Sequence, residues 1–224
     1  MEIFIDTSAP KEIVRWLENG VIDGVTTNPS IMYKDGCRDL KAGILRICEI
    51  VKPLPVSAEV TTNDIDEMII QGRGFATWAD NIVVKIPIIN EHGDPALKAI
   101  KTLTGEGIRV NVTACLSYGQ AILAAKAGAT YVSLFLGRIN DEGNDGPSVV
   151  RMTRDWLDLW DHPSKIIAGS IRSVMDIQQA AAAGAHVLTI PPPFLTKMVD
   201  HQYSRLTVKQ FVQDGQRAFS EIEA

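Results

Sequence analysis

The sequence predicts an α/β protein, a (β/α)8 TIM barrel with one additional helix toward its C-terminal end. Short β-branched segments alternate with longer amphipathic segments along the whole chain, which is typical of βα units repeated around a parallel sheet. Eight strand candidates in 224 residues match the strand number of a closed barrel, whereas an open doubly wound sheet usually has fewer.

The expected strands are short and largely apolar, and they lie at 2–6, 21–26, 55–60, 81–86, 108–113, 129–135, 165–169 and 186–190. Helical periodicity fills the intervals, near 10–19, 37–51, 63–78, 95–105, 117–127, 147–160 and 173–183, with a shorter candidate at 194–200 and a last amphipathic helix at about 205–222. No linker, low-complexity segment or block of charge divides the chain, so we expect one domain over residues 1–224.

Several helix ends have recognisable chemistry. Thr62 and Asn63 precede the third helix and Ser173 precedes the seventh, where an oxygen-bearing side chain can accept a hydrogen bond from an unpaired amide. Three glycines follow helical segments and precede strands, where a left-handed residue ends a helix at low energetic cost. They are Gly20, Gly128 and Gly184.

Composition and charge exclude several classes of protein. A net charge of −5 gives no overall basic field of the kind that supports nonspecific nucleic-acid binding. The three cysteines form no CxxC pair and are too scattered for a disulfide framework. No secretory signal opens the sequence, and no run approaches the ~18 apolar residues of a membrane span. We therefore expect a cytoplasmic protein without a nucleic-acid or membrane partner.

Polar side chains gather at the carboxyl ends of the expected strands, although both faces of a parallel barrel strand are buried. They are Asp6, Thr26, Asn28, Glu59, Lys85, Asn111, Thr113, Ser133, Ser170 and Arg172. Barrel active sites are built at this end from several different strands, so a set drawn from seven strands favours a site. The alternative for any single residue is that it only marks the point where a strand gives way to a loop.

Lys85 is the most informative of these residues, because it stands among aliphatic side chains in NIVVKIPI. One interpretation is a lysine that extends out of a strand end into water. The other is an amine kept neutral by desolvation and by the cations Arg138 and Arg172, and therefore able to attack a ketone. Glu59, on the preceding strand, is placed to move protons during imine formation, or it is only an ion-pair partner of Lys85.

Two arginines, Arg138 in GRIND and Arg172 in GSIRS, predict a fork-shaped anion clamp, because guanidinium matches phosphate or sulfonate oxygens with paired donors. The alternative for each arginine is a solvated surface charge. The four histidines lack metal-ligand spacing, so no metal site is expected. The glycines near 105–107 and 141–146 are better explained as loop residues than as a nucleotide cradle.

Six segments distributed along nearly the whole chain are IFIDTSAPKEI, GVIDGVTTNPSI, NIVVKIP, GIRVNVTACLS, AGATYVSLFLGRIND and AGSIRS. Together they resemble the small-subunit transaldolase family, the branch that includes fructose-6-phosphate aldolases. The resemblance implies a Schiff-base enzyme without metal or organic cofactor, acting on a small sugar phosphate in carbohydrate metabolism. It also implies a homo-oligomer, a pentamer or decamer, and the final helix is expected to pack on the barrel or on a neighbouring subunit. The departures from the family described below add a sulfosugar to the expected substrates.

The resemblance also implies roles for individual residues. Lys85 would be the Schiff-base lysine, Glu59 and Thr113 would hold the catalytic water, and Asp6 would be the acid/base at the C4 hydroxyl. The substrate would be bound by Thr27, Asn28, Asn111, Ser133, Phe135, Arg138, Ser170 and Arg172, of which Arg138, Ser170 and Arg172 would hold its terminal anion.

Glutamate at 59 and phenylalanine at 135 resemble transaldolases, whereas fructose-6-phosphate aldolase has glutamine and tyrosine there, which favours transfer over simple cleavage. The chain departs from the family near the expected mouth, at Ala114, Leu134, Gly169, Ser173 and the insertion-like NEHGDP.

We therefore expect transfer of a dihydroxyacetone unit from fructose 6-phosphate or 6-deoxy-6-sulfofructose to an aldose phosphate. Two alternatives stay open, an aldolase that releases free dihydroxyacetone and a non-catalytic sugar-phosphate-binding barrel.

Overall fold

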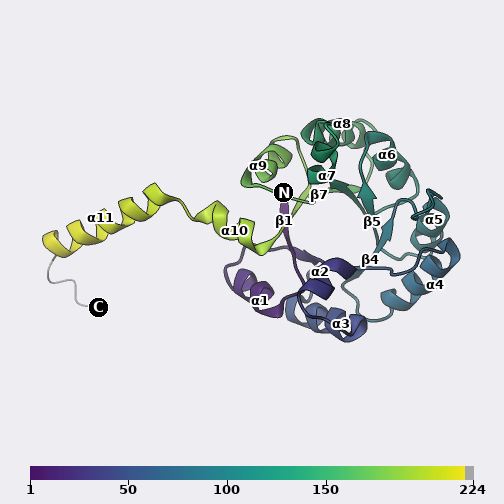
Figure 1. Cartoon of the computed structure of the whole chain (residues 1–224), viewed down its shortest axis with the longest axis horizontal. Helices are drawn as coiled ribbons and strands as arrows, with labels where there is room; N and C mark the ends of the chain where they lie inside the picture. Colours follow the sequence, from purple (N-terminus) through teal and green to yellow (C-terminus); the bar gives the residue numbers. More distant parts are fainter. Residues whose placement is uncertain (220–224) are drawn as a thin grey trace. The chain divides into compact units, whose positions relative to one another are not determined.

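A closed parallel barrel forms the first part of the chain, as the sequence predicts. The computed structural model describes residues 1–219, and its eight strands follow chain order until β8 pairs with β1. The strands are β1 Glu2–Asp6, β2 Gly24–Thr26, β3 Val56–Glu59, β4 Ile82–Pro87, β5 Val110–Cys115, β6 Tyr131–Phe135, β7 Lys165–Gly169 and β8 Val187–Ile190. Figure 1 shows them as a ring with helices on the outside. All eight expected strands are confirmed; β2, β3, β6 and β8 are shorter than predicted, and β4 and β5 are displaced by one or two residues.

The helices follow the strands in the βα order. In the compact unit Met1–Pro192 they are α1 Pro10–Glu18, α2 Pro29–Lys34, α3 Leu40–Val51, α4 Ile65–Ala76, α5 Leu97–Gly105, α6 Tyr118–Lys126, α7 Leu136–Asp141, α8 Gly146–Leu159 and α9 Val174–Ala182. The second unit begins at Pro193, and α10 Pro192–Val199 and α11 Gln202–Ala218 follow the barrel in sequence. Of the helix expected at about 205–222, residues 220–222 lie outside the described part.

Two short helices were not predicted, α2 and α7. Each has six residues, which is too few for a clear helical period. The start of α2 nevertheless has a favourable sequence, because Asn28 caps the helix and Pro29 occupies its first turn. The expected helix from residue 37 begins instead at Leu40, where Asp39 is the cap.

The helix ends confirm most of the predicted caps. Ser173 caps α9 in a reciprocal capping box with Asp176. The three glycines adopt positive φ, at 68° for Gly20, 100° for Gly128 and 91° for Gly184. The predicted cap at Thr62 and Asn63 is wrong. Asp64 caps α4 by accepting hydrogen bonds from the amides of Asp66 and Glu67, each at 2.9 Å.

One apolar layer inside the barrel is built from five different strands. Its members are the buried residues Phe4, Val83, Tyr131, Ile167 and Val187, which form one cluster. The rings of Phe4 and Tyr131 meet edge to face with centroids 5.8 Å apart. Residues two apart on a strand share a face, so the positions above this layer point into the same side of the barrel. Those positions are Asp6, Lys85, Ser133, Gly169 and Thr189.

In the second unit, α11 is amphipathic, but none of its residues is buried. Its large apolar side chains include Tyr203, Leu206, Val208, Phe211 and Val212, each at least half exposed. Within residues 1–219, no helix is long and apolar enough to cross a membrane.

Candidate active site

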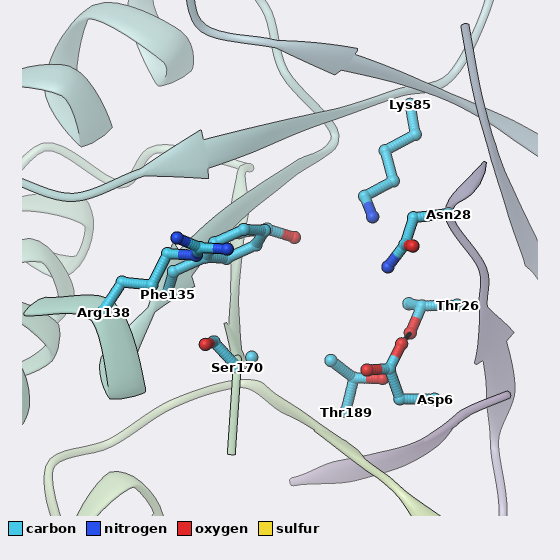
Figure 2. A pocket seen from close by; sticks show the side chains of 10 residues that line it. Asp6, Thr26, Asn28, Lys85, Phe135, Arg138, Ser170 and Thr189 are labelled. Carbon is cyan, nitrogen blue, oxygen red and sulfur yellow. Dashed lines mark hydrogen bonds between the residues drawn. The ribbon is translucent and has the colours of Figure 1, made fainter. Parts of the chain in front are cut away.

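A pocket lies at the carboxyl-terminal mouth of the barrel, above the apolar layer (Figure 2). It is lined by Asp6, Thr26, Asn28, Lys85, Ser133, Phe135, Arg138, Gly169, Ser170 and Thr189. The five positions that follow the apolar layer are all among these residues. The pocket therefore forms where strand register brings the ends of distant segments together.

Lys85 is buried, with a residue exposure of 4%, and Figure 2 shows its amine directed into the pocket. Its Nζ lies 3.0 Å from a carboxylate oxygen of Glu59 and donates to the backbone carbonyl of Thr27 at 3.1 Å. The interpretation of Lys85 as a lysine that extends into water is therefore wrong. Because Lys85 also lines the pocket, its amine is placed to meet a ligand there.

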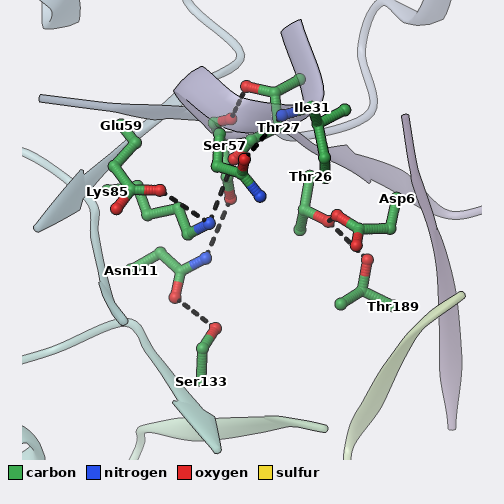
Figure 3. Close-up of polar contacts among 11 residues, drawn as sticks. Asp6, Thr26, Thr27, Ile31, Ser57, Glu59, Lys85, Asn111, Ser133 and Thr189 are labelled. Carbon is green, nitrogen blue, oxygen red and sulfur yellow. Dashed lines mark hydrogen bonds and ion pairs between the residues drawn. The ribbon is translucent and has the colours of Figure 1, made fainter. Parts of the chain in front are cut away.

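Glu59 reaches Lys85 because the two residues stand opposite each other in the pairing of β3 with β4 (Figure 3). The Glu59 side chain is 19% exposed, so it has more access to solvent than Lys85. An ion pair fits both roles expected for Glu59, a proton relay and a structural partner. The contact alone does not separate them.

Asp6 stands at the end of β1 in a network with two threonines (Figure 3). The Thr26 hydroxyl donates to the Asp6 carboxylate at 2.7 Å and also contacts the hydroxyl of Thr189. Burial raises the pKa of Asp6 above its ordinary value, although the charge of Lys85 and the Thr26 hydrogen bond act in the opposite direction. A carboxyl group with a raised pKa is suited to exchanging a proton with a substrate hydroxyl.

Asn28 and Thr27 connect β2 to α2. The Asn28 side-chain oxygen accepts a hydrogen bond from the amide of Ile31 at 2.8 Å, while its nitrogen faces the pocket in Figure 2. The Thr27 hydroxyl donates to the Ser57 carbonyl at 2.8 Å, and Thr27 does not line the pocket. Asn28 thus presents an amide donor to a ligand, and Thr27 contributes its backbone carbonyl to Lys85.

A buried chain of hydrogen bonds runs behind the lysine. Ser133 donates to the Asn111 side-chain oxygen at 2.7 Å, and the Asn111 nitrogen donates to the Ser57 hydroxyl at 3.1 Å (Figure 3). Asn111 lies opposite Lys85 in the pairing of β4 with β5, although only Ser133 lines the pocket. The Thr113 hydroxyl is buried and has no hydrogen-bond partner among residues 1–219.

The two arginines of the expected anion clamp have different surroundings. Arg138 lines the pocket together with Phe135 and Ser170. Arg172 does not line it, and its guanidinium donates to the Asp141 carboxylate at 2.7 Å, with both side chains about half exposed. The mouth therefore offers one pocket-facing guanidinium and a second that is already paired.

Gly137 fixes the path of Arg172. A Cβ at Gly137 would lie 2.2 Å from the Ser170 carbonyl oxygen and 2.8 Å from the Arg172 Cγ, which no real side chain tolerates. The Gly137 amide also donates to that carbonyl at 3.1 Å. Glycine at this position lets the ends of β6 and β7 approach and lets Arg172 pass over α7 to Asp141.

Thr26, Gly169 and Thr189 also line the pocket, but the sequence does not predict them as catalytic or substrate-binding residues. Thr26 is predicted only as a polar residue at a strand end. Thr189 is the single polar residue of VLTI in β8, and its spacing from Val187 could have identified it. Within residues 1–219, no group of three His, Cys, Asp or Glu side chains lies close enough together to hold a metal ion.

A closed parallel barrel with a buried lysine, an adjacent carboxylate and a second carboxyl group at its C-terminal mouth defines a barrel enzyme. The family model described as transaldolase/fructose-6-phosphate aldolase matches residues 3–223. The chain belongs to the transaldolase/fructose-6-phosphate aldolase family, and it is an enzyme of the transaldolase type.

Several bacterial proteins are similar to the chain over its whole length. A probable transaldolase of Clostridium botulinum (strain Hall) is 45% identical over 221 residues, which cover 99% of both chains. A probable transaldolase of Lactiplantibacillus plantarum is 45% identical over 214 residues, 96% of both chains. Probable transaldolase 2 of Listeria monocytogenes is 44% identical over 223 residues, 100% of this chain and 99% of its own.

Proposed function

We propose that the protein is a class I transaldolase in which Lys85 forms a Schiff base with the donor ketose. The donor bears a terminal anion, as in fructose 6-phosphate or 6-deoxy-6-sulfofructose, and the acceptor is an aldose phosphate. The observation that carries the proposal is a buried amine, directed into the mouth pocket, whose only charged side-chain contact among residues 1–219 is Glu59.

Imine formation requires Lys85 to attack the C2 carbonyl as a neutral amine. Glu59, 3.0 Å away, accepts a proton from the ammonium and returns it to the carbinolamine oxygen, which leaves as water. The buried Thr113 hydroxyl, which has no partner among the described residues, supports a role in holding that water. The same groups act in reverse during hydrolysis of the product imine.

Cleavage breaks the C3–C4 bond, and its electron pair enters the iminium to give an enamine on Lys85. Asp6 takes the proton of the C4 hydroxyl, which becomes the carbonyl of the departing aldehyde. The acceptor aldehyde then adds to the enamine carbon, and Asp6 returns the proton to the new hydroxyl. The raised pKa of Asp6 supports both directions of this transfer.

The dihydroxyacetone hydroxyls are held by the Asn28 amide and by the Ser133 hydroxyl, and Asn111 fixes the orientation of Ser133. The terminal anion is bound by Arg138 and the Ser170 hydroxyl, with Arg172 at the rim. Phe135 lines the pocket beside Arg138 and, unlike tyrosine, has no hydroxyl that could deliver a proton to the enamine (Figure 2). This arrangement supports transfer over release of free dihydroxyacetone.

Borohydride reduction in the presence of fructose 6-phosphate tests the proposal. Lys85 should be labelled in the wild-type chain, and Lys85→Met should lose both label and turnover. Lys165→Met is a matched control, because Lys165 is also a strand lysine paired with a glutamate, Glu2, but lies at the other end of the barrel. A wild-type chain that turns over without label on Lys85 would exclude the mechanism.

Product analysis separates transfer from the aldolase alternative. A transaldolase needs an aldose acceptor for turnover, whereas an aldolase releases dihydroxyacetone without one. Parallel assays with fructose 6-phosphate and 6-deoxy-6-sulfofructose identify the donor. Sugar-phosphate affinity without turnover of any donor would instead support the non-catalytic barrel.

The proposal extends to a cytoplasmic homo-oligomer, a pentamer or decamer. The homo-oligomer is supported by α11, because its apolar side chains, including Phe211 and Val212, are exposed in the single chain and could be covered by another subunit. Sedimentation of the full-length protein tests the assembly.

A further inference from the structure

Asp35 directly follows α2 and makes contacts that the proposed mechanism does not use. One of its carboxylate oxygens accepts three hydrogen bonds, from the Thr7 hydroxyl at 2.9 Å, the Ser8 amide at 2.8 Å and the Ser8 hydroxyl at 3.0 Å. Thr7 and Ser8 are buried, and they are the two residues that follow Asp6. The carboxylate of Asp35 therefore ties the end of β1 to the end of α2.

The other end of α2 is also fixed to the site. Asn28 caps the helix through its side-chain oxygen, and this bond orients the amide nitrogen toward the pocket. The backbone amide of Asp35 continues the helical pattern by donating to the Ile31 carbonyl at 2.8 Å. The short helix α2 therefore links two parts of the site. Asn28 lies at its first end, and at its other end Asp35 binds the two residues that follow Asp6.

We propose that Asp35 is a positioning residue, which holds Asp6 and Asn28 at the spacing that carbon–carbon bond cleavage requires. The inference rests on the proposed function, because it assigns Asp35 to the same reaction. Thr26, in β2, restrains the side chain of Asp6. Asp35 restrains the backbone that directly follows Asp6, because its carboxylate accepts the hydrogen bond from the Ser8 amide. Small displacements of reacting groups lower rates steeply, by as much as about 100-fold per ångström.

The negative charge of Asp35 also affects Asp6, because it helps to raise the pKa of the Asp6 carboxyl group. Burial is the main cause of the raised pKa of Asp6, and the negative charges of Glu59 and Asp35 add to it, while Lys85 and Thr26 oppose it. An uncharged amide oxygen at position 35 has two lone pairs and can still accept two of the three hydrogen bonds from Thr7 and Ser8. Asparagine at position 35 consequently separates the positioning role from the charge.

The test compares three variants of the full-length chain with fructose 6-phosphate as donor and an aldose phosphate as acceptor. Asp35→Ala should lower kcat about 10- to 100-fold. Asp35→Asn should recover most of the kcat that Asp35→Ala loses, because its oxygen still accepts two of the three hydrogen bonds. Asp39→Ala is the matched control, because Asp39 lies in the same connection between α2 and α3. Its carboxylate caps α3 by accepting a hydrogen bond from the Ala42 amide, and within residues 1–219 it makes no hydrogen bond to Thr7 or Ser8.

Borohydride trapping with dihydroxyacetone is the second readout, since this ketone forms the imine without carbon–carbon cleavage. Asp35→Ala should still label Lys85 at saturating ketone. Loss of kcat with retained label and rescue by Asp35→Asn supports the inference. A kcat equal to that of Asp39→Ala, no rescue, or loss of the label would each overturn it.

Failure of the proposed function gives a different result. In that case the wild-type chain itself shows neither label on Lys85 nor transfer, whatever residue stands at position 35.

Discussion

The Lys85 Nζ lies 3.0 Å from a carboxyl oxygen of Glu59, and strand pairing places the two residues directly opposite each other. Glu59→Gln keeps a side chain of similar size and removes its ability to accept the proton. We expect kcat to fall by about 10²- to 10⁴-fold, the usual contribution of a proton-transfer group. Rapid-quench borohydride trapping should show slower imine formation. Imine formation at the wild-type rate would leave Glu59 only its structural role.

The raised pKa of Asp6 makes stability depend on pH with a predictable sign. The folded state binds the Asp6 proton more tightly than the unfolded state. The free energy of unfolding therefore falls as pH rises from 3.8, the ordinary pKa of an aspartate, through the raised pKa of Asp6 in the folded protein. Asp6→Asn should therefore be more stable than wild type at neutral pH and equal to it in strong acid. Each 1 kcal/mol gained should raise Tm by about 2–4 °C in a chain of this size.

Asp145→Asn is the control with the opposite sign. Hydrogen bonds from Ser148 lower the pKa of Asp145. The ionised Asp145 carboxylate therefore stabilises the folded state above the ordinary aspartate pKa of 3.8, and this stabilisation is lost as pH falls through the lowered pKa. This variant should be less stable than wild type at neutral pH. Calorimetric scans between acid and neutral pH measure both differences, and parallel curves for the two variants would contradict the assignment.

The unequal arginines predict unequal effects on donor affinity. Arg138→Ala should raise KM for an anionic ketose about 10- to 100-fold, because it removes a charge-assisted contact inside the pocket. Arg172→Ala should raise it only a few fold, since its guanidinium is bound to Asp141. Steady-state assays with fructose 6-phosphate compare them, and a larger effect at Arg172 would mean that it leaves Asp141 when substrate binds.

The cysteines should react selectively in the native protein. Burial raises the pKa of Cys48 to about 11 and that of Cys115 to about 12, and both side chains are almost inaccessible. Cys37 is partly exposed. Alkylation at pH 8 should therefore modify Cys37 alone, and all three thiols after denaturation. Peptide mass spectrometry distinguishes these results, and early modification of Cys115 would contradict the buried position of β5.

Much of the site follows from the alternation of strands and the polar residues at their ends. The burial of Lys85 among aliphatic neighbours could be predicted from NIVVKIPI, because period and composition are local properties. The pairing of Glu59 with Lys85 depends on the register between β3 and β4. The polar residues at the strand ends are consistent with this register, but they do not determine it. The short helices α2 and α7 were missed, since six residues give too little periodicity.

Contacts between distant residues could not be predicted in the same way. Arg172 pairs with Asp141, 31 positions away, because Gly137 leaves a path for its side chain. Asp35 binds Ser8 from 27 positions away. Such contacts depend on the direction of single side chains after the barrel has closed, and neither charge patterning nor periodicity contains that information.

The double use of Asn28 restricts which substitutions its position tolerates. Aspartate, serine and threonine all begin helices well, and each would satisfy the amide of Ile31 as asparagine does. None of them carries an NH2 group, so the same exchange would leave the helix intact and replace a ligand donor by a hydroxyl or a negative charge. Asparagine alone among the good helix-starting residues meets the folding requirement and the recognition requirement together.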